Sequence, residues 1–312
     1  MPTVNIKLVL DEVIDHNLEF IIDVRHATDS LQREIRNVQD SLSRGQTMFL
    51  QFMQSLINDL EVSSIRTAEA YLHARNQLRG FLPDNDIPIR LITSEIIEKY
   101  EHYLKTKKLS LNTISFHMRI LRAAYNKAVE KGLADNYSPF KHVYTGIAKT
   151  SKRAITLQEI KKIKNYRTSN SSVEYARDMF LFSFYTRGMS FVDMAYLKHS
   201  NIKNGWLRYQ RHKTGQPIAI KWESCMEELV SRLPVSNAPY LLPIIHTANG
   251  KERSQYRNKQ NFINLKLKSL AQDICLGNNL TMYVARHSWA SIAEANDLPL
   301  SLISLGMGHT SE

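Results

Sequence analysis

Apolar residues recur at intervals of three and four along residues 46–132, and this spacing predicts four amphipathic helices. The helices are expected over residues 46–60 and 64–80, after Thr93, and from Ser110 to Gly132. Ser110 suits an N-cap, and Gly132 suits the C-terminal end of the last helix. Pro83 and Pro88 interrupt the pattern between the second helix and the third. Four such helices predict one compact helical domain.

The second half of the chain changes its pattern twice. Thr156 and Glu159 form a capping-box sequence that predicts a helix start, and residues 175–185 are apolar enough for a buried helix. Residues 205–222 alternate between apolar and polar, which predicts a β-hairpin with Lys213 at its tip. Helical spacing returns at residues 223–232 and 261–276 and in the last thirty residues. The fold class expected is mainly α, with an α+β second domain that contains a small antiparallel sheet.

These patterns divide the chain into four segments. Residues 1–45 form an N-terminal arm of uncertain structure, because a possible strand precedes a charged stretch with helical spacing. The helical domain is expected over 46–138. Residues 139–153 lose periodicity and gather basic side chains, so they are predicted to be a linker. The second domain is expected over 154–312.

The net charge of the chain restricts the classes of molecule that it is expected to bind. Lys and Arg number 41 against 30 Asp and Glu, a formal net charge of +11, which favours a polyanion such as nucleic acid. No apolar run approaches the roughly 20 residues of a membrane span, and no leader pattern follows Met1, so a cytoplasmic protein is expected. Cys225 and Cys275 lack the spacing of a zinc site or a disulfide framework, and are predicted to be small core residues.

The fourth predicted helix combines its apolar stripe with basic side chains. His117, Arg119, Arg122 and Lys127 are assigned to the face opposite the stripe. Such a face could contact the DNA backbone, or it could be an ordinary solvated surface. Both interpretations stay open at this stage.

Four features of the second domain occur in a fixed order along the chain. They are residues 187–193, the hairpin turn 213–215, residues 283–287 and the pair Gly308 and His309. Together they resemble the catalytic half of the tyrosine recombinases, the family of phage integrases and DNA invertases. Residues 111–116 and 122–132 resemble that family's SAM-like core-binding domain. The sequence of residues 185–194 most resembles the branch of the family from Bacteroides-type bacteria and their mobile elements.

The resemblance implies a reaction and a set of roles. In this family a tyrosine hydroxyl attacks a DNA phosphodiester and forms a 3′-phosphotyrosine link, so neither a metal nor another cofactor is needed. Arg286 would bind the phosphate oxygens, Lys213 would protonate the leaving 5′ oxygen, and His309 would donate a hydrogen bond to the phosphate. Arg211 and His212, beside the hairpin tip, are expected to contact double-stranded DNA. The family acts as a homotetramer on DNA.

Two positions depart from the family pattern. Tyr283 stands where the family usually has a histidine, and its phenol can donate a hydrogen bond but is a poor proton shuttle near neutral pH. Ser190 stands where the family has its first arginine, and with Asp193 it reads as a helix-capping pair. Arg187, one helical turn earlier, is the candidate for the missing cation; the alternative is an arginine that faces a helix C-terminus.

The nucleophile is the third departure. The family's tyrosine follows the Gly-His pair by about one helix start, whereas the last tyrosine here is Tyr283. Tyr283 itself is a weak candidate, since it already occupies the activating position. The expectation is a chain truncated before its nucleophile, and therefore inactive alone in cleavage. The alternative is a natural DNA-binding remnant that occupies recombination sites or regulates a full-length relative.

Overall fold

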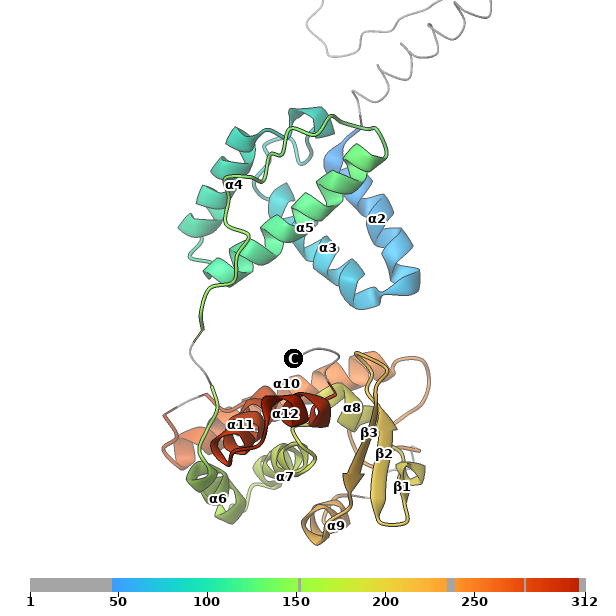
Figure 1. The fold of residues 1–312 in the computed structure, drawn as a ribbon, viewed down its shortest axis with the longest axis vertical. Coiled ribbons are helices and arrows are strands. Elements are labelled where there is room, and N and C mark those ends of the chain that lie inside the picture. The colour runs from blue at the N-terminus through green and yellow to red at the C-terminus, as the bar shows by residue number, and fades with distance from the viewer. Residues whose placement is uncertain (1–46, 151–152, 235–238, 278, 309–312) are drawn as a thin grey trace, which may run out of the picture. The chain divides into compact units, whose positions relative to one another are not determined.

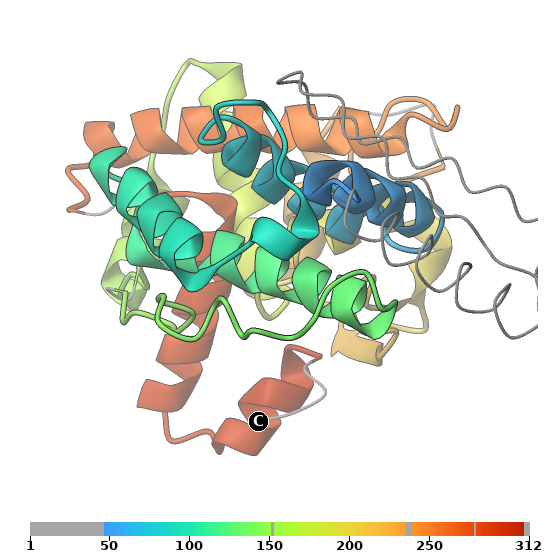
Figure 2. The same cartoon turned by 90° about the horizontal axis from the view of Figure 1, so that it is seen from above.

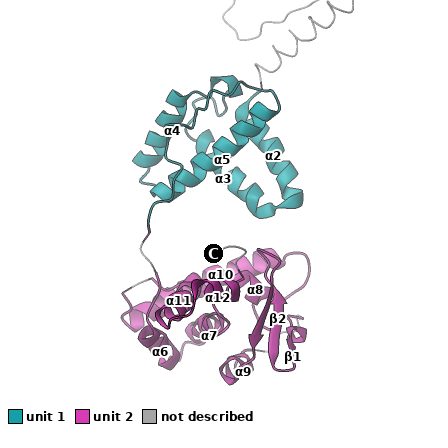
Figure 3. Cartoon of the chain, in the orientation of Figure 1, with its two compact units in different colours: residues 1–149 teal, residues 150–312 magenta. Residues whose placement is uncertain are grey.

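The computed structural model describes residues 47–150, 153–234, 239–277 and 279–308. The chain divides into two compact units, residues 1–149 and residues 150–312 (Figure 3). The predicted N-terminal arm, residues 1–45, lies outside the described residues. Each unit has its own hydrophobic core.

The described part of unit 1 contains four α-helices, as the sequence predicts (Figure 1). These are α2 (Phe49–Ser63), α3 (Ile65–Arg79), α4 (Ser94–Thr106) and α5 (Leu111–Glu130), with a short 3-10 helix η1 (Ile89–Leu91) before α4. Ser110 caps α5 by accepting a hydrogen bond from the Thr113 amide. Gly132 ends the helix in the left-handed conformation at φ +68°. The predicted caps are therefore confirmed at both ends of α5.

The first part of the predicted linker packs against unit 1. Phe140 and Val143 are buried in the core of that unit. The side chain of Asn112 makes two hydrogen bonds to the backbone of Ala148, of 2.8 and 3.1 Å. These contacts hold residues 140–148 on the helices, because the loop's backbone polar groups find partners there.

Unit 2 is built around α7, which is apolar around most of its circumference. Figure 1 shows the helices and the small sheet of this unit grouped around it, and α7 packs against α6, α9, α10 and α11. The helices are α6 (Leu157–Asn165), α7 (Ser171–Tyr185), α8 (Phe191–Tyr196), α9 (Ser224–Ser231), α10 (Glu252–Asp273), α11 (Met282–Ala295) and α12 (Leu300–Gly306). The predicted capping box of Thr156 and Glu159 is present at the start of α6. After α11 the chain turns back, so α12 packs beside it (Figure 2).

The sheet has three antiparallel strands in the order β1-β2-β3: β1 (Ile202–Lys203), β2 (Trp206–Gln210) and β3 (Pro217–Lys221). It follows a short 3-10 helix, η2 (His199–Asn201). Leu207 pairs with Ile220 and Tyr209 with Ile218, so these four side chains share the face that lies against the core of unit 2. The predicted hairpin is confirmed, and the fold is mainly helical with a small antiparallel sheet, as expected.

Candidate active site

The connection between α7 and α8 holds the first predicted motif. Ser190 is the N-cap of α8, accepts a hydrogen bond from the Asp193 amide, and donates one of 2.6 Å to Oδ2 of Asp193. The hydroxyl is therefore engaged in capping, as the sequence predicts. Asp193 is only 3% exposed, so its second oxygen, Oδ1, needs a partner of its own.

The hairpin tip supplies that partner. Oδ1 of Asp193 accepts a 2.8 Å hydrogen bond from the His212 amide, and the imidazole Nδ1 of His212 lies 3.4 Å from the same oxygen. The His212 ring stacks on Tyr196, with centroids 4.7 Å apart. Lys213 follows at the exposed turn, which closes where Gly215 donates to the Arg211 carbonyl at 2.8 Å. A buried carboxylate therefore fixes the hairpin tip beside Lys213.

Arg286 lies on the buried side of α11. Its Nη1 donates to the Gly188 carbonyl and its Nη2 to the Met307 carbonyl, both at 2.8 Å. Burial lowers the pKa of the Arg286 guanidinium, and the neighbouring charge of Arg211 lowers it further. The side chain stays cationic, because an arginine begins from so high a pKa.

Gly188 allows Arg286 to lie this close. A Cβ on Gly188 would stand 2.7 Å from the Cα of Arg286, and the backbone there has φ +69°. Both observations require glycine at this position. The glycine of the predicted motif therefore brings the end of α7 against α11.

Arg211 is the second buried guanidinium of this region. It follows β2 on the same side of the strand as Leu207 and Tyr209, and only 7% of it is exposed. Its Nη1 donates to the Gly308 carbonyl, which also accepts a 3.1 Å hydrogen bond from the Thr214 hydroxyl. Its Nε is buried and has no hydrogen-bond partner in the part of the chain that the structure describes. Arg211 was predicted as a surface contact to DNA, and the sequence analysis missed its burial beside Arg286.

The charges that act on the pKa of Tyr209 show that the charged groups of this region lie close together. Burial raises the pKa of its phenol, and so does the charge of Asp193, while Arg286, Arg211 and Arg187 act in the opposite direction. One phenol therefore lies within electrostatic range of a carboxylate and three guanidinium groups. The alternation along β2 could have indicated Tyr209 and Arg211 as members of the site, since it places both on the inner face.

Arg187 adopts the left-handed backbone conformation, φ +60°, just after α7. Its side chain is half-buried and passes within about 4 Å of the place where a Cβ on Gly306 would lie. It lines a groove of about 510 Å³ together with an apolar group: Ile218, Trp289, Leu298, Leu302 and Leu305. Arg187 is thus near the region of Arg286 but faces an apolar surface beside α12.

Tyr283 is exposed on the first turn of α11, and its ring stands edge-on to His287 with centroids 4.4 Å apart. Burial lowers the pKa of His287, and the charges of Arg286 and Arg153 lower it further. His309 lies outside the described residues. Arg286 and Arg211, however, donate to the carbonyls of Met307 and Gly308, the two residues just before it.

The predicted DNA-contacting residues of α5 belong to unit 1. Arg119, Arg122 and Lys127 are exposed. The prediction that His117 lies on the exposed face is wrong, because His117 is 4% exposed. It follows Ile114 by three residues and precedes Leu121 by four, so it belongs to the stripe that packs in the core.

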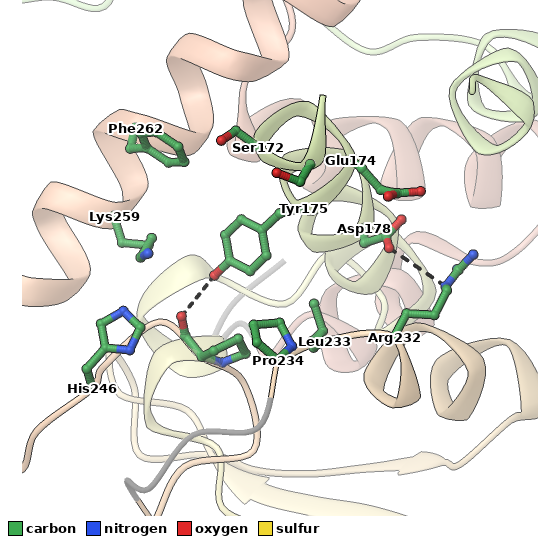
Figure 4. A pocket seen from close by; sticks show the side chains of 12 residues that line it. Ser172, Glu174, Tyr175, Asp178, Arg232, Leu233, Pro234, His246, Lys259 and Phe262 are labelled. Carbon is green, nitrogen blue, oxygen red and sulfur yellow. Dashed lines mark hydrogen bonds and ion pairs between the residues drawn. The ribbon is translucent and has the colours of Figure 1, made fainter. Parts of the chain in front are cut away.

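Another pocket of unit 2, of about 610 Å³, opens at the start of α7 (Figure 4). Lys259 lies over the rings of Tyr175 and Phe262, at 5.5 and 5.8 Å from their centroids. The Tyr175 hydroxyl donates to the Pro243 carbonyl, and Arg232 approaches Asp178 at 3.8 Å. None of the predicted site residues lines this pocket.

Neither a metal-binding group nor a membrane-spanning helix is found among the described residues. No three His, Cys, Asp or Glu side chains among them converge as a metal-binding group. None of the helices in the described ranges combines the length and apolar character of a membrane span.

Comparison with known proteins identifies the fold. Residues 48–145 match the Phage integrase SAM-like domain family. A lambda integrase dimer, residues 75–356, bound to a COC′ core site aligns with a TM-score of 0.65 and 18% identity over 85% of this chain and 93% of that chain. The Tn1549 transposon integrase in complex with a circular intermediate DNA aligns with a TM-score of 0.64 and 14% identity over the same shares.

A lambda integrase tetramer bound to a Holliday junction aligns with a TM-score of 0.65 and 17% identity over 92% of this chain and 83% of that chain. No curated protein sequence matches this chain. The chain therefore contains a phage-integrase SAM-like domain and has the fold of the tyrosine recombinases.

Proposed function

We propose that this protein is a site-specific recombinase that cuts and rejoins double-stranded DNA through a 3′-phosphotyrosine intermediate. The observation that carries the proposal is the pair of buried guanidinium groups, Arg286 and Arg211, on adjacent backbone carbonyls beside the hairpin that bears Lys213. Cations fixed in a desolvated site suit a phosphodiester whose charge grows in the transition state. The solved structures with this fold support the proposal, since they are integrases bound to DNA.

The proposed reaction uses the residues of this site in distinct roles. A tyrosine hydroxyl loses its proton to water and attacks the phosphorus, the bond from phosphorus to the 5′ oxygen breaks, and Lys213 gives a proton to that oxygen. Arg286 holds the non-bridging oxygens, while Tyr283 and His309 donate hydrogen bonds at the edge of the site. Rejoining is the reverse step, with a 5′ hydroxyl as the nucleophile. The phosphate ester bond is conserved, so no cofactor is consumed.

Unit 1 is proposed to bind the DNA backbone through Arg119, Arg122 and Lys127, which are exposed on α5. Each phosphate contact releases counterions, so duplex affinity should fall steeply as salt rises. We further propose that four copies assemble on two duplexes. The lambda integrase tetramer on a Holliday junction supports this assembly by analogy.

The test uses the 312-residue chain and the natural reading frame that carries it. A duplex with the sequence that the protein selects from random DNA is nicked near the cleavage position, so that a cut strand leaves and a covalent adduct accumulates. The proposal expects that the 312-residue chain binds DNA in a salt-dependent way. It also expects a covalent adduct that resists denaturation when the protein translated from the whole natural reading frame is used. A Lys213→Ala variant should bind equally and form adduct about 100-fold more slowly.

Binding without an adduct from the natural reading frame would contradict recombination. That result would favour a DNA-binding protein that occupies recombination sites without cutting them. Absence of salt-dependent duplex binding would contradict both functions.

A further inference from the structure

The position of the first arginine creates a chemical problem for the proposed reaction. Ser190 holds that position, and its hydroxyl donates to Asp193 at 2.6 Å while it caps α8. It therefore has no proton to offer a phosphate and carries no positive charge. A second cation has to come from elsewhere if two guanidinium groups are to share the non-bridging oxygens.

Arg211 has the geometry of that cation. The side chain is 7% exposed, and none of the ion pairs among the described residues includes it. Nη1 is held by the Gly308 carbonyl, and Nε is buried without a hydrogen-bond partner in the described ranges. A buried guanidinium that is held by a carbonyl oxygen and forms no ion pair among the described residues keeps its positive charge for an anion.

Arg211 and Arg286 donate hydrogen bonds to two consecutive residues. Arg286 donates to the Met307 carbonyl, and Arg211 donates to the next carbonyl, that of Gly308. A Cβ on Gly308 would stand 2.9 Å from Cδ of Arg211 and 2.8 Å from Cδ1 of Ile218, so a larger residue there would push Arg211 away. Each arginine is thus packed against a glycine, and the two positive groups are brought together rather than kept apart.

Arg187 is less suited to the task. Its side chain lines the groove beside Trp289, Leu302 and Leu305. The charge of Arg211 is among those that lower the pKa of Arg286. Arg187 therefore lies at the edge of the region, on the side of α12.

We propose that Arg211, and not Arg187, replaces the first arginine and binds the scissile phosphate together with Arg286. This inference rests on the proposed function for its substrate, but the anion site itself does not. The site takes a tetrahedral oxyanion, bound by the guanidinium group of Arg211. Arg211 is then a catalytic residue that directly follows β2 and stands two residues before Lys213.

The first experiment measures anion binding by the 312-residue chain. Inorganic phosphate is titrated calorimetrically into the wild type and the variants Arg211→Met, Arg286→Met and Arg187→Met. The inference expects at least a tenfold weaker affinity for Arg211→Met and Arg286→Met, and a change below twofold for Arg187→Met. Equal unfolding temperatures of wild type and Arg211→Met establish that the variant is folded. Loss in Arg187→Met with retention in Arg211→Met would overturn the inference.

The second experiment measures adduct formation on the nicked duplex with the natural reading frame. Arg211→Met should slow it by a factor of about 10² to 10³ and leave duplex affinity within threefold. For the Arg211→Ala variant, added methylguanidinium should raise the rate of adduct formation at least tenfold. A merely structural role of Arg211 would not allow this rescue. No rescue, with a slow rate only in Arg187 variants, would refute the assignment. If the wild type forms no adduct but the phosphate results hold, the proposed function fails and the two-arginine anion site stands.

Discussion

Two of the buried arginines of unit 2 are held in opposite ways. Arg177, near the start of α7, is 1% exposed; it donates to Asp178 at 2.8 Å and to the Tyr166 carbonyl at 2.7 Å, and pairs with Glu174 at 3.0 Å. Arg211 is 7% exposed, but its hydrogen bond goes to the uncharged carbonyl of Gly308 and its Nε lacks a partner within the described residues.

The difference separates a structural cation from a functional one. Carboxylates around Arg177 neutralise its charge, so the cluster is complete within the protein. Carbonyls orient Arg211 without cancelling its charge, so the positive potential remains for an external anion. Burial alone therefore does not identify a functional arginine; the chemical nature of its partners does.

The largest effect expected is on stability. Arg177→Met leaves Asp178 buried without its main partner and should lower the free energy of unfolding by about 3–5 kcal/mol. Arg211→Met should change it by less than about 1 kcal/mol, because the Gly308 carbonyl keeps the Thr214 hydroxyl as a donor. Urea denaturation of both variants measures the contrast. Equal losses would show that Arg211 is as structural as Arg177.

A second prediction concerns the glycine that brings Arg286 into the region. Gly188→Ala places a Cβ 2.7 Å from the Cα of Arg286 at a positive φ, and should lower the free energy of unfolding by about 2–4 kcal/mol. Gly215→Ala is the matched control, since its φ is also +69° but no atom lies within 4 Å of the added Cβ. Its loss should be about 1 kcal/mol. Thermal unfolding separates the two, and similar losses would mean that the close approach is relieved cheaply.

A third prediction tests the anchor of the hairpin tip. Asp193→Ala removes the acceptor for the His212 amide and should slow adduct formation by about 10- to 100-fold, because Lys213 is then less well oriented. Asp193→Asn keeps an oxygen for that amide and should retain most of the rate. Ser190→Ala, which loses only the capping hydroxyl, is the control for α8. An Asp193→Ala enzyme as fast as the wild type would remove the anchor from the mechanism.

The smallest effect concerns a buried histidine, His117 of unit 1. Burial lowers its pKa, and the charge of His73 lowers it further. The folded protein therefore binds this proton less readily than the unfolded chain, whose histidine titrates near 6.5. The stability that this group contributes is present above about pH 6.5 and is lost as the pH falls towards the lowered folded value.

Denaturation at pH 7 and pH 5 tests this linkage. A His117→Leu variant should lose less stability between the two pH values than the wild type does, because it no longer has the proton to bind. His102→Leu is the matched control, since His102 is exposed on α4. An identical pH dependence in wild type and His117→Leu would contradict the assignment.

Local chemistry made much of the molecule predictable from its sequence. The cap of α8 followed from Ser190 and Asp193, which are three residues apart, and the hairpin followed from alternation. Errors arose where a pattern was assigned too narrowly. The stripe of α5 was assigned from Ile114, Met118, Leu121 and Tyr125, although a 3.6-residue period also includes His117.

The partner that stabilises Arg211 in the interior could not be predicted from local pattern, because this acceptor is distant in sequence. Alternation places it on the inner face of β2, where an arginine is ordinarily unstable. The Gly308 carbonyl that stabilises it lies 97 residues further along the chain. Only the packing of the end of α12 against the hairpin brings the two together.

The cap that Ser190 makes for α8 has an evolutionary consequence. Replacing Ser190 with the arginine that the family resemblance predicts there would remove the cap, at about 1 kcal/mol, and would add a third guanidinium to the proposed site. Positions 190 and 211 are therefore expected to show sign epistasis, in which reversion at either one alone is deleterious. Comparison of such enzymes should treat these two positions as one inherited unit.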